Sequence, residues 1–440
     1  MSGQRGAPRL RRRLPAAVGY CGHGVASVST VLKSAPTRWG RFAAVAGPGL
    51  VVMLADTDAG SVITAAQSGA IWGYALLALQ FALIPVLYIV QELTVRLGIV
   101  TGRGHGALIC DHFGHFWAWI SVGTLVLACL GALLSELSGL AGVGQLYGVP
   151  AGVTMGIVFV GLTLMAITGT YRSVERLAMA FGAFELVFFL VAWKAQPDAG
   201  TVLRGMGSVP WSQVSYRYMV AANIGAVLMP WMVFFQQSAI VEKGLGREDM
   251  AAARWDTLLG AVATQLIMAA VLVATAAGLG AGARGLPLEN VPQIADAFTR
   301  VLGDNTGRVL FGLGMAGSAL VATIVVTLTA ARSLSELLGV KHSLEHAPTE
   351  APWFYGVYTV SLGLGAALVA TQGNLVRVSV GVQVMNALLL PVVLGFLYLL
   401  ARRLPAADRL RGPYAATVLA VIVVTTALGV LAALSGIFSN

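Results

Sequence analysis

The chain has 440 residues, of which 57% are hydrophobic and only 11% are charged, and it carries a formal net charge of +9 at pH 7. Soluble domains contain about 25% charged residues, so this composition excludes a soluble enzyme. The positive charges lie in short segments between apolar stretches, where they set membrane topology rather than bind nucleic acid.

The chain begins with a basic segment and continues as a series of apolar ones. Residues 1–40 combine a run of arginines with a stretch rich in Gly, Ser and Ala, which predicts a disordered cytoplasmic N-terminal tail rather than a signal peptide. Apolar segments long enough to span a membrane follow, and they predict an all-α polytopic membrane protein. The eleven segments lie near residues 42–70, 72–97, 117–146, 151–170, 174–194, 217–242, 254–282, 309–337, 353–371, 376–400 and 413–437.

Lysine and arginine are unevenly distributed over the segments that join these spans. If the N-terminus is inside, the inside segments hold 21 of the 28 basic residues and the outside segments hold 7. Cytoplasmic loops of membrane proteins carry such an excess. The distribution therefore predicts a multi-pass protein of the cell (inner) membrane, with its N-terminus in the cytoplasm and its C-terminus outside.

Two of the spans carry interruptions near mid-depth. In the first, the sequence DTDAGS at residues 56–61 places two carboxylates where a plain lipid-facing helix cannot hold them. In the sixth, Pro230 removes a backbone donor and breaks the helix. The two broken spans are five apart, so the second set of five runs in the opposite direction to the first. This pattern is typical of an inverted-repeat transporter whose site lies between the breaks.

The residues at these breaks are candidate metal ligands. Unwound backbone frees carbonyl oxygens, and neighbouring carboxylates add the negative charge that replaces part of a cation's hydration shell. Oxygen ligands suit Mg²⁺, whereas a thioether favours softer transition metals. Gly60 and Pro230 are expected to hold the breaks open. The candidate ligands are Asp56, Asp58, Ser61, the carbonyl of Ala226, and Met229, with the amides of Gln383 and Asn386 from the tenth span.

Each of these residues also has a structural alternative. Asp58 could only cap a half-helix, Asp56 could face a water-filled vestibule, and Met229 could be packing. Gln383 could make an interhelical hydrogen bond. The acids Glu92, Glu136 and Glu185 could carry protons or be buried structural groups.

Histidine offers no proton relay through the membrane, because all six histidines lie outside the predicted spans. Three of them lie in one loop without a recognisable ligand spacing and are expected to be solvated: His105, His112 and His115. Carboxylates would have to carry any coupled proton.

At the two breaks the sequence resembles the NRAMP family of divalent metal transporters. That family has Asp-Pro-Gly-Asn in its first span and Ala-x-x-Met-Pro-His in its sixth; residues 58–61 read DAGS and residues 226–231 read AVLMPW here. Gly47-Pro48, the segment RLGIVTG at residues 96–102 and Gln383 also match. The resemblance covers about residues 40 to 400.

This resemblance implies a fold and a set of domain boundaries. It implies about eleven transmembrane helices, of which the first ten form a LeuT-like 5+5 inverted repeat with broken helices one and six. The transporter core would comprise residues 41–402, with repeats at about 42–194 and 217–400. Residues 403–440 would form a loop and the eleventh transmembrane helix.

Four departures from the family pattern bear on the transported ion. Ser61 replaces the family's Asn, Trp231 replaces a histidine linked to proton movement, and Asp56 is an additional carboxylate. Glu136 keeps one acid of a proton-handling pair in the third span, while Leu133 replaces the other. These changes are similar to those in the divergent NRAMP-related magnesium transporters, where a partly hydrated ion is carried. The retained Met229 favours Mn²⁺ or Fe²⁺ instead, and the sequence leaves this conflict open.

The sequence as a whole predicts a secondary transporter that imports Mg²⁺ and Mn²⁺ by alternating access, with weak or no proton coupling and no cofactor. One alternative is an ordinary proton-coupled Mn²⁺/Fe²⁺ symporter. Another is an amino-acid permease on the same fold, although Asp56 and Asp58 would repel a substrate carboxylate. The expected partners are a divalent metal ion and the lipid bilayer, not nucleic acid, and a monomer is compatible with the sequence. No enzymatic constellation lies within the spans.

Overall fold

The computed structural model describes residues 48–168, 180–279 and 285–437, apart from residues 342, 345 and 372. The predicted N-terminal tail, residues 1–40, lies outside the described residues. Regular structure in the described chain is entirely helical, as the sequence predicts. The elements are α2 (Pro48–Asp56), α3 (Ala59–Trp72), α4 (Leu77–Thr101), α5 (His105–Phe113), α6 (His115–Leu146), α7 (Ala151–Thr168), η2 (Ala183–Leu186), α9 (Val187–Ala195), α10 (Ala199–Met206), α11 (Val214–Val227), α12 (Pro230–Lys243), η3 (Arg247–Asp249), α13 (Met250–Gly278), α15 (Val291–Leu302), α16 (Asp304–Leu337), α17 (Pro352–Thr371), α18 (Leu375–Arg403) and α19 (Gly412–Ile437).

Most predicted spans correspond to helices long and apolar enough to cross a membrane. Among the described residues there are nine such spans, and the bent pair of α2 and α3 makes a tenth. The second span begins later than predicted, at Leu77, because residues 73–76 form a turn after α3. The predicted fifth span, 174–194, begins outside the described residues; its described part contains η2 and α9.

Both predicted breaks are present. Helix α2 ends at Asp56 and α3 begins at Ala59, with an angle of 48° between them. In the sixth span α11 ends at Val227, and Pro230 is the first residue of α12. Proline is favoured at this position because the first helical N–H has no intrahelical acceptor in any case.

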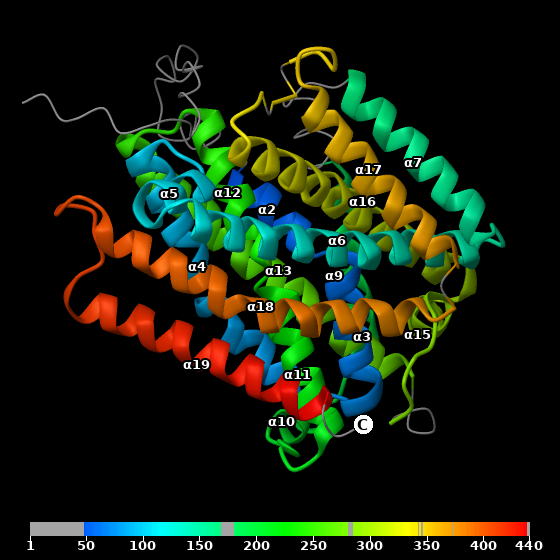
Figure 1. Ribbon diagram of the computed structural model, residues 1–440. Helices are drawn as coiled ribbons and strands as arrows, with labels where there is room; N and C mark the ends of the chain where they lie inside the picture. The colour runs from blue at the N-terminus through cyan, green and yellow to red at the C-terminus, as the bar shows by residue number, and fades with distance from the viewer. Residues whose placement is uncertain are drawn as a thin grey trace, which may run out of the picture.

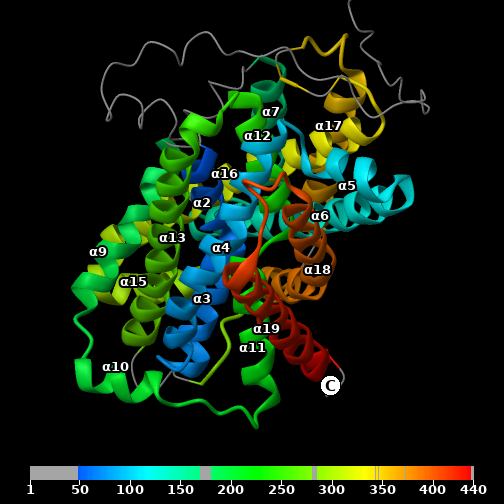
Figure 2. The same ribbon diagram turned by 90° about the vertical axis from the view of Figure 1, so that its left-hand side faces the viewer.

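The broken helices occupy the middle of the bundle (Figures 1 and 2). In the most apolar stretch of the α11–α12 span, 94% of the residues are buried, against 17% in α7 and 39% in α19. The latter two are therefore peripheral helices, and α19 lies along α18 at one side of the molecule (Figure 1). Helix α11 is held closely against α18, since a Cβ at Gly225 would overlap the carbonyl oxygen of Gln383.

Candidate metal site

Asp58 lies in the first break, fully buried between α2 and α3. One carboxylate oxygen, Oδ1, accepts a hydrogen bond of 2.6 Å from the backbone N–H of Ser61 and so caps α3. The other oxygen, Oδ2, is buried without a hydrogen-bond partner. Burying a charged oxygen without a partner is costly. Capping therefore accounts for one oxygen of this carboxylate, while the carboxyl as a whole also lies against that of Glu136, so that a bound cation would offset the repulsion between the two acids.

Glu136 of α6 approaches the same helix start. Its Oε2 accepts a hydrogen bond of 2.9 Å from the backbone N–H of Ala59, while its Oε1 is buried without a partner. Free N–H groups at a helix N-terminus attract negative charge, which explains why two acids converge on the first turn of α3. The structure thus brings Glu136 to the predicted site.

Ser61 connects the two breaks. Its hydroxyl donates a hydrogen bond of 2.9 Å to the carbonyl oxygen of Ala226, at the end of α11. That carbonyl lies where the helical ladder ends, since α12 begins only at Pro230. Two predicted ligands from sequence-distant spans therefore lie side by side, close to Asp58.

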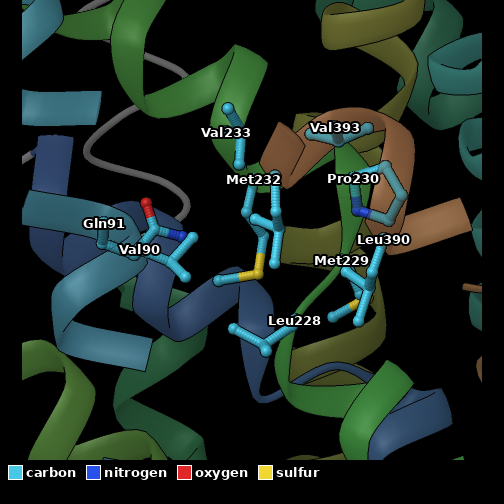
Figure 3. A pocket seen from close by; sticks show the side chains of 10 residues that line it. Val90, Gln91, Leu228, Met229, Pro230, Met232, Val233, Leu390 and Val393 are labelled. Atoms are coloured by element: carbon cyan, nitrogen blue, oxygen red, sulfur yellow. The ribbon is translucent and has the colours of Figure 1, made fainter. Parts of the chain in front are cut away.

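Met229 is buried in the second break, where it is engaged by its neighbour Trp231. The indole N–H of Trp231 donates to the Met229 sulfur at 3.2 Å. Figure 3 shows a small pocket at this break, lined by apolar side chains and by Gln91, with Met229 on the side of Leu390 and Met232 on the side of Val90. The thioether thus lies among mainly apolar side chains and already accepts one hydrogen bond.

The predicted amides of α18 lie against α3. Asn386 donates to the Gln383 oxygen at 2.9 Å, which leaves the Gln383 nitrogen and the Asn386 oxygen buried without partners. A Cβ at Gly60 would overlap the Gln383 amide, so the absence of a side chain at Gly60 makes room for Gln383. Gly60 lies inside α3 and not in the break itself, where the sequence placed it. If both side-chain amides rotate by 180°, the hydrogen bond between them is kept. The oxygen of Gln383, rather than its nitrogen, then faces Gly60.

Two further acids lie near the first break. Asp56 is 1% exposed and both of its oxygens lack hydrogen-bond partners, so the alternative of a water-filled vestibule does not describe it here. Glu185 of η2 is fully buried, and it lies close to the Thr57 hydroxyl and within electrostatic range of Asp56 and Asp58. The sequence presents Glu185 only as a buried acid of the fifth span; its position beside Asp56 depends on the packing of η2 against the broken span.

The remaining acid, Glu92, belongs to an ion-pair network. Its Oε1 accepts from Arg96 at 2.7 Å and from Arg254 at 2.6 Å, and Tyr414 donates to its Oε2 at 3.3 Å. Glu92 has the contacts of a structural acid.

The expectation that the loop histidines are solvated is correct for His112 and His115, which are exposed, but wrong for His105. That side chain is 1% exposed, lies within 3.1 Å of the Gln237 amide oxygen and packs edge-on against Phe234. Burial lowers the pKa of His105 to about 4. Sequence reasoning missed this because α5 folds back onto α12.

Among the described residues, no group of three or more His, Cys, Asp or Glu side chains is arranged to hold a metal ion. A cation at the breaks would therefore depend on a mixed set of carboxylate, carbonyl and amide oxygens. Such a set suits a transported ion, which must leave again, better than a permanently bound one.

Comparison with known proteins gives a family match over most of the chain. The family model described as "Natural resistance-associated macrophage protein-like" (Nramp) matches residues 49–439. The "Divalent metal cation transporter MntH" of Bradyrhizobium diazoefficiens is 27% identical over 322 residues, which cover 69% of this chain and 70% of that protein. The protein of the same name from Brucella suis is 28% identical over 295 residues, 64% of each chain.

Solved structures agree with the observed fold. A manganese transporter of Eremococcus coleocola superposes with a TM-score of 0.74 at 19% identity, covering 94% of this chain and 92% of that chain. MhsT in complex with L-phenylalanine superposes with a TM-score of 0.56 at 14% identity, covering 91% and 99%. At these identities the likeness is one of fold, and it is the LeuT-like fold that the broken helices predict.

Proposed function

This chain belongs to the Nramp family of divalent metal transporters, and we propose that it imports Mg²⁺ and Mn²⁺ across the cell membrane by alternating access. The observation that carries the proposal is the buried Asp58 carboxyl, whose Oδ2 receives no donated hydrogen bond and which lies beside Ser61, the carbonyl of Ala226 and the Glu136 carboxyl. The names of the matched relatives, divalent metal cation transporter and manganese transporter, support the same substrate class. We propose Asp58, Ala226, Met229 and Gln383 as the principal ligands.

The hydrogen bonds of two candidate ligands favour a partly hydrated, hard ion. Ser61 already donates to Ala226, and the Met229 sulfur already accepts from Trp231. The Ser61 hydroxyl keeps its oxygen lone pairs while it donates, so it can face an ion directly or through water, whereas one lone pair of the Met229 sulfur is already engaged by Trp231. Mg²⁺ dehydrates reluctantly and keeps several waters, so it fits a site that it contacts largely through oxygen and water.

Proton coupling in this proposal is weak or absent. Trp231 has no titratable group, and the fully buried Leu133 replaces an acid of the family's pair. The membrane potential supplies about 2.3 kcal/mol per charge per 100 mV, and about twice that for a divalent ion. Inward movement of the metal therefore needs no proton.

The second candidate is a proton-coupled Mn²⁺/Fe²⁺ symporter. It is favoured by Met229 and by the buried carboxyl groups of Glu136 and Glu185, which are able to carry protons. An amino-acid permease is less well supported, because Asp56 and Asp58 would repel the substrate carboxylate and the likeness to MhsT is one of fold alone.

The orientation and the domain division belong to the same proposal. We place the N-terminus in the cytoplasm and the C-terminus outside, on the strength of the basic residues in the inside segments. We assign the repeats to about residues 42–194 and 217–400, with the loop and last helix at 403–440 outside them. The transporter would work as a monomer and would catalyse no covalent reaction.

Flux into proteoliposomes tests the function. The full chain is reconstituted, Mg²⁺, Mn²⁺ and Ca²⁺ are offered separately, and a pH dye reports the lumen. We expect Mg²⁺ and Mn²⁺ entry that follows the membrane potential and leaves internal pH unchanged. Mn²⁺ entry with acidification and no Mg²⁺ flux would instead establish the symporter, and absence of all metal flux would refute both.

A further inference from the structure

The loop between the last two spans borders an open cavity of about 420 Å³. Arg402, in the last turn of α18, and Arg409 and Arg411, in the loop, line it together with Tyr398. Leu419 and neighbouring small residues of α19 complete the wall. The cavity therefore lies where two membrane helices end, at the level expected for lipid headgroups.

The positive charge of this cavity is not neutralised by the described part of the chain. No acid lines the cavity, and no described carboxylate pairs with Arg402, Arg409 or Arg411. The nearby Asp408 pairs with Arg247 at 2.7 Å instead. The three arginines are exposed, and as basic residues of an inside segment they contribute to topology, but their convergence on one cavity also concentrates positive charge there.

A neighbouring arginine shows the contrast. Arg403 donates to the carbonyl of His112 at 2.9 Å and stacks on the ring of Phe113 at 4.1 Å, so it fastens α18 to α5. Within the described residues, Arg402 contacts Tyr398 of its own helix, donating to the hydroxyl at 3.2 Å and lying 5.9 Å from the ring centroid. The charges on the cavity are thus left available to a ligand.

We propose that this cavity binds the phosphate headgroup of an anionic membrane lipid. A guanidinium group can donate two parallel hydrogen bonds to the oxygens of one phosphate. Basic pockets between membrane helices on the cytoplasmic side are suited to such headgroups. Beyond the cavity α19 presents apolar side chains outward, with Leu419 42% exposed and Val423 52% exposed. These offer a surface for an acyl chain, which a free phosphate ion would not use.

Lipid binding to the purified full chain tests the proposal. Cardiolipin, phosphatidylglycerol and phosphatidylcholine are titrated onto the detergent-solubilised protein, and bound lipid is counted by native mass spectrometry. The triple variant R402Q/R409Q/R411Q is compared with K194Q/R204Q/R308Q, which removes the same charge from exposed residues elsewhere. We expect the first triple to bind anionic lipid at least about tenfold more weakly, and the control to bind like the wild type.

Several outcomes would overturn the proposal: equal binding by both triples, equal binding of phosphatidylcholine, or full competition by inorganic phosphate at the same concentration as lipid. The last would identify a phosphate-ion site rather than a lipid site. If the triple variant fails to fold, R411E alone carries the test through the same titration, with a several-fold loss expected. The metal flux of the wild type is measured separately, so a failure of the proposed transport does not affect this result.

Discussion

At the residue scale, Asp58 combines a structural and a proposed ligand role on its two oxygens, and the roles can be separated. Asparagine caps helices as well as aspartate does, so Asp58→Asn keeps the bond to Ser61 while removing the charge. We expect metal flux to fall at least about tenfold, with thermal stability nearly unchanged. The matched control is Asp198→Asn, which alters another N-cap aspartate, that of α10, far from the site. Full flux by the Asp58 variant would refute the site assignment.

The hydrogen bond from Trp231 to Met229 gives a prediction about ion choice. Trp231→Phe removes the donor and leaves the thioether free to bind a soft metal. We expect the ratio of Mn²⁺ to Mg²⁺ flux to rise several-fold. Adding Met229→Leu should cancel this rise, whereas Trp211→Phe, at an exposed tryptophan, should leave the ratio unchanged. A ratio unaffected by either change would mean that the sulfur does not take part in selection.

His105 predicts a pH dependence of stability. Its pKa is about 4 in the folded protein against 6.5 for a free side chain, because burial disfavours its charged form. Below pH 6.5 the unfolded chain binds a proton that the folded chain does not. The contribution of His105 to stability is therefore constant above pH 6.5 and falls between pH 6.5 and 4, by about 3 kcal/mol at most.

Thermal unfolding of the wild type and His105→Gln, followed from pH 7.5 to 5, checks this dependence. The variant cannot titrate at this position, so its unfolding temperature should change less with pH than that of the wild type. His112→Gln, at an exposed histidine, should behave like the wild type. Parallel curves for wild type and His105→Gln would show that another group dominates.

At the scale of elements, the contact between α11 and α18 depends on Gly225. A methyl group there would overlap the Gln383 carbonyl, forcing the two helices apart. We expect Gly225→Ala to lower the unfolding temperature by several degrees and to reduce metal flux. The control is Gly395→Ala, on α18, where a Cβ meets open space and where alanine should be neutral or slightly stabilising. Equal stability of both variants would show that the contact relaxes at little cost.

The elements also show which features of the structure the sequence could predict. Both breaks were predictable, since Pro230 and the acids of residues 56–58 violate local rules for a membrane helix. The contacts of Glu136 with Ala59 and of Gln383 with Gly60 were not predictable from the residues alone. These pairs are far apart in the chain, and only helix packing brings them together. The buried position of Glu185 beside Asp56 depends on the same packing.

At the scale of the whole molecule, the two ends differ. One end holds a cavity of about 830 Å³, lined by Gln67 of α3, Tyr218 of α11 and Arg377 of α18 among others. Toward the other end, the Glu92 network ties α4, α13 and α19 together. The site residues between them are buried. Alternating access would require this arrangement to invert, so that the network opens as the cavity closes.

The Glu92 network should therefore control the population of the two states. Glu92→Gln removes the charge that holds Arg96 and Arg254, which favours opening of that end. A single cysteine at Tyr218, in a chain whose native cysteines are replaced, reports on the cavity through its reaction with a membrane-impermeant maleimide. We expect Glu92→Gln to slow this labelling several-fold, because the cavity closes as the other end opens.

The control for this inversion is Asp111→Asn, which breaks an ion pair with Arg103 whose side chains are about one third exposed (37% and 34%). Exposed pairs contribute little to stability, so labelling at position 218 should not change. A lower unfolding temperature for Glu92→Gln with unchanged labelling would identify the network as a static brace. Slower labelling would instead show that the two ends of the molecule are coupled through the helices between them, as alternating access requires.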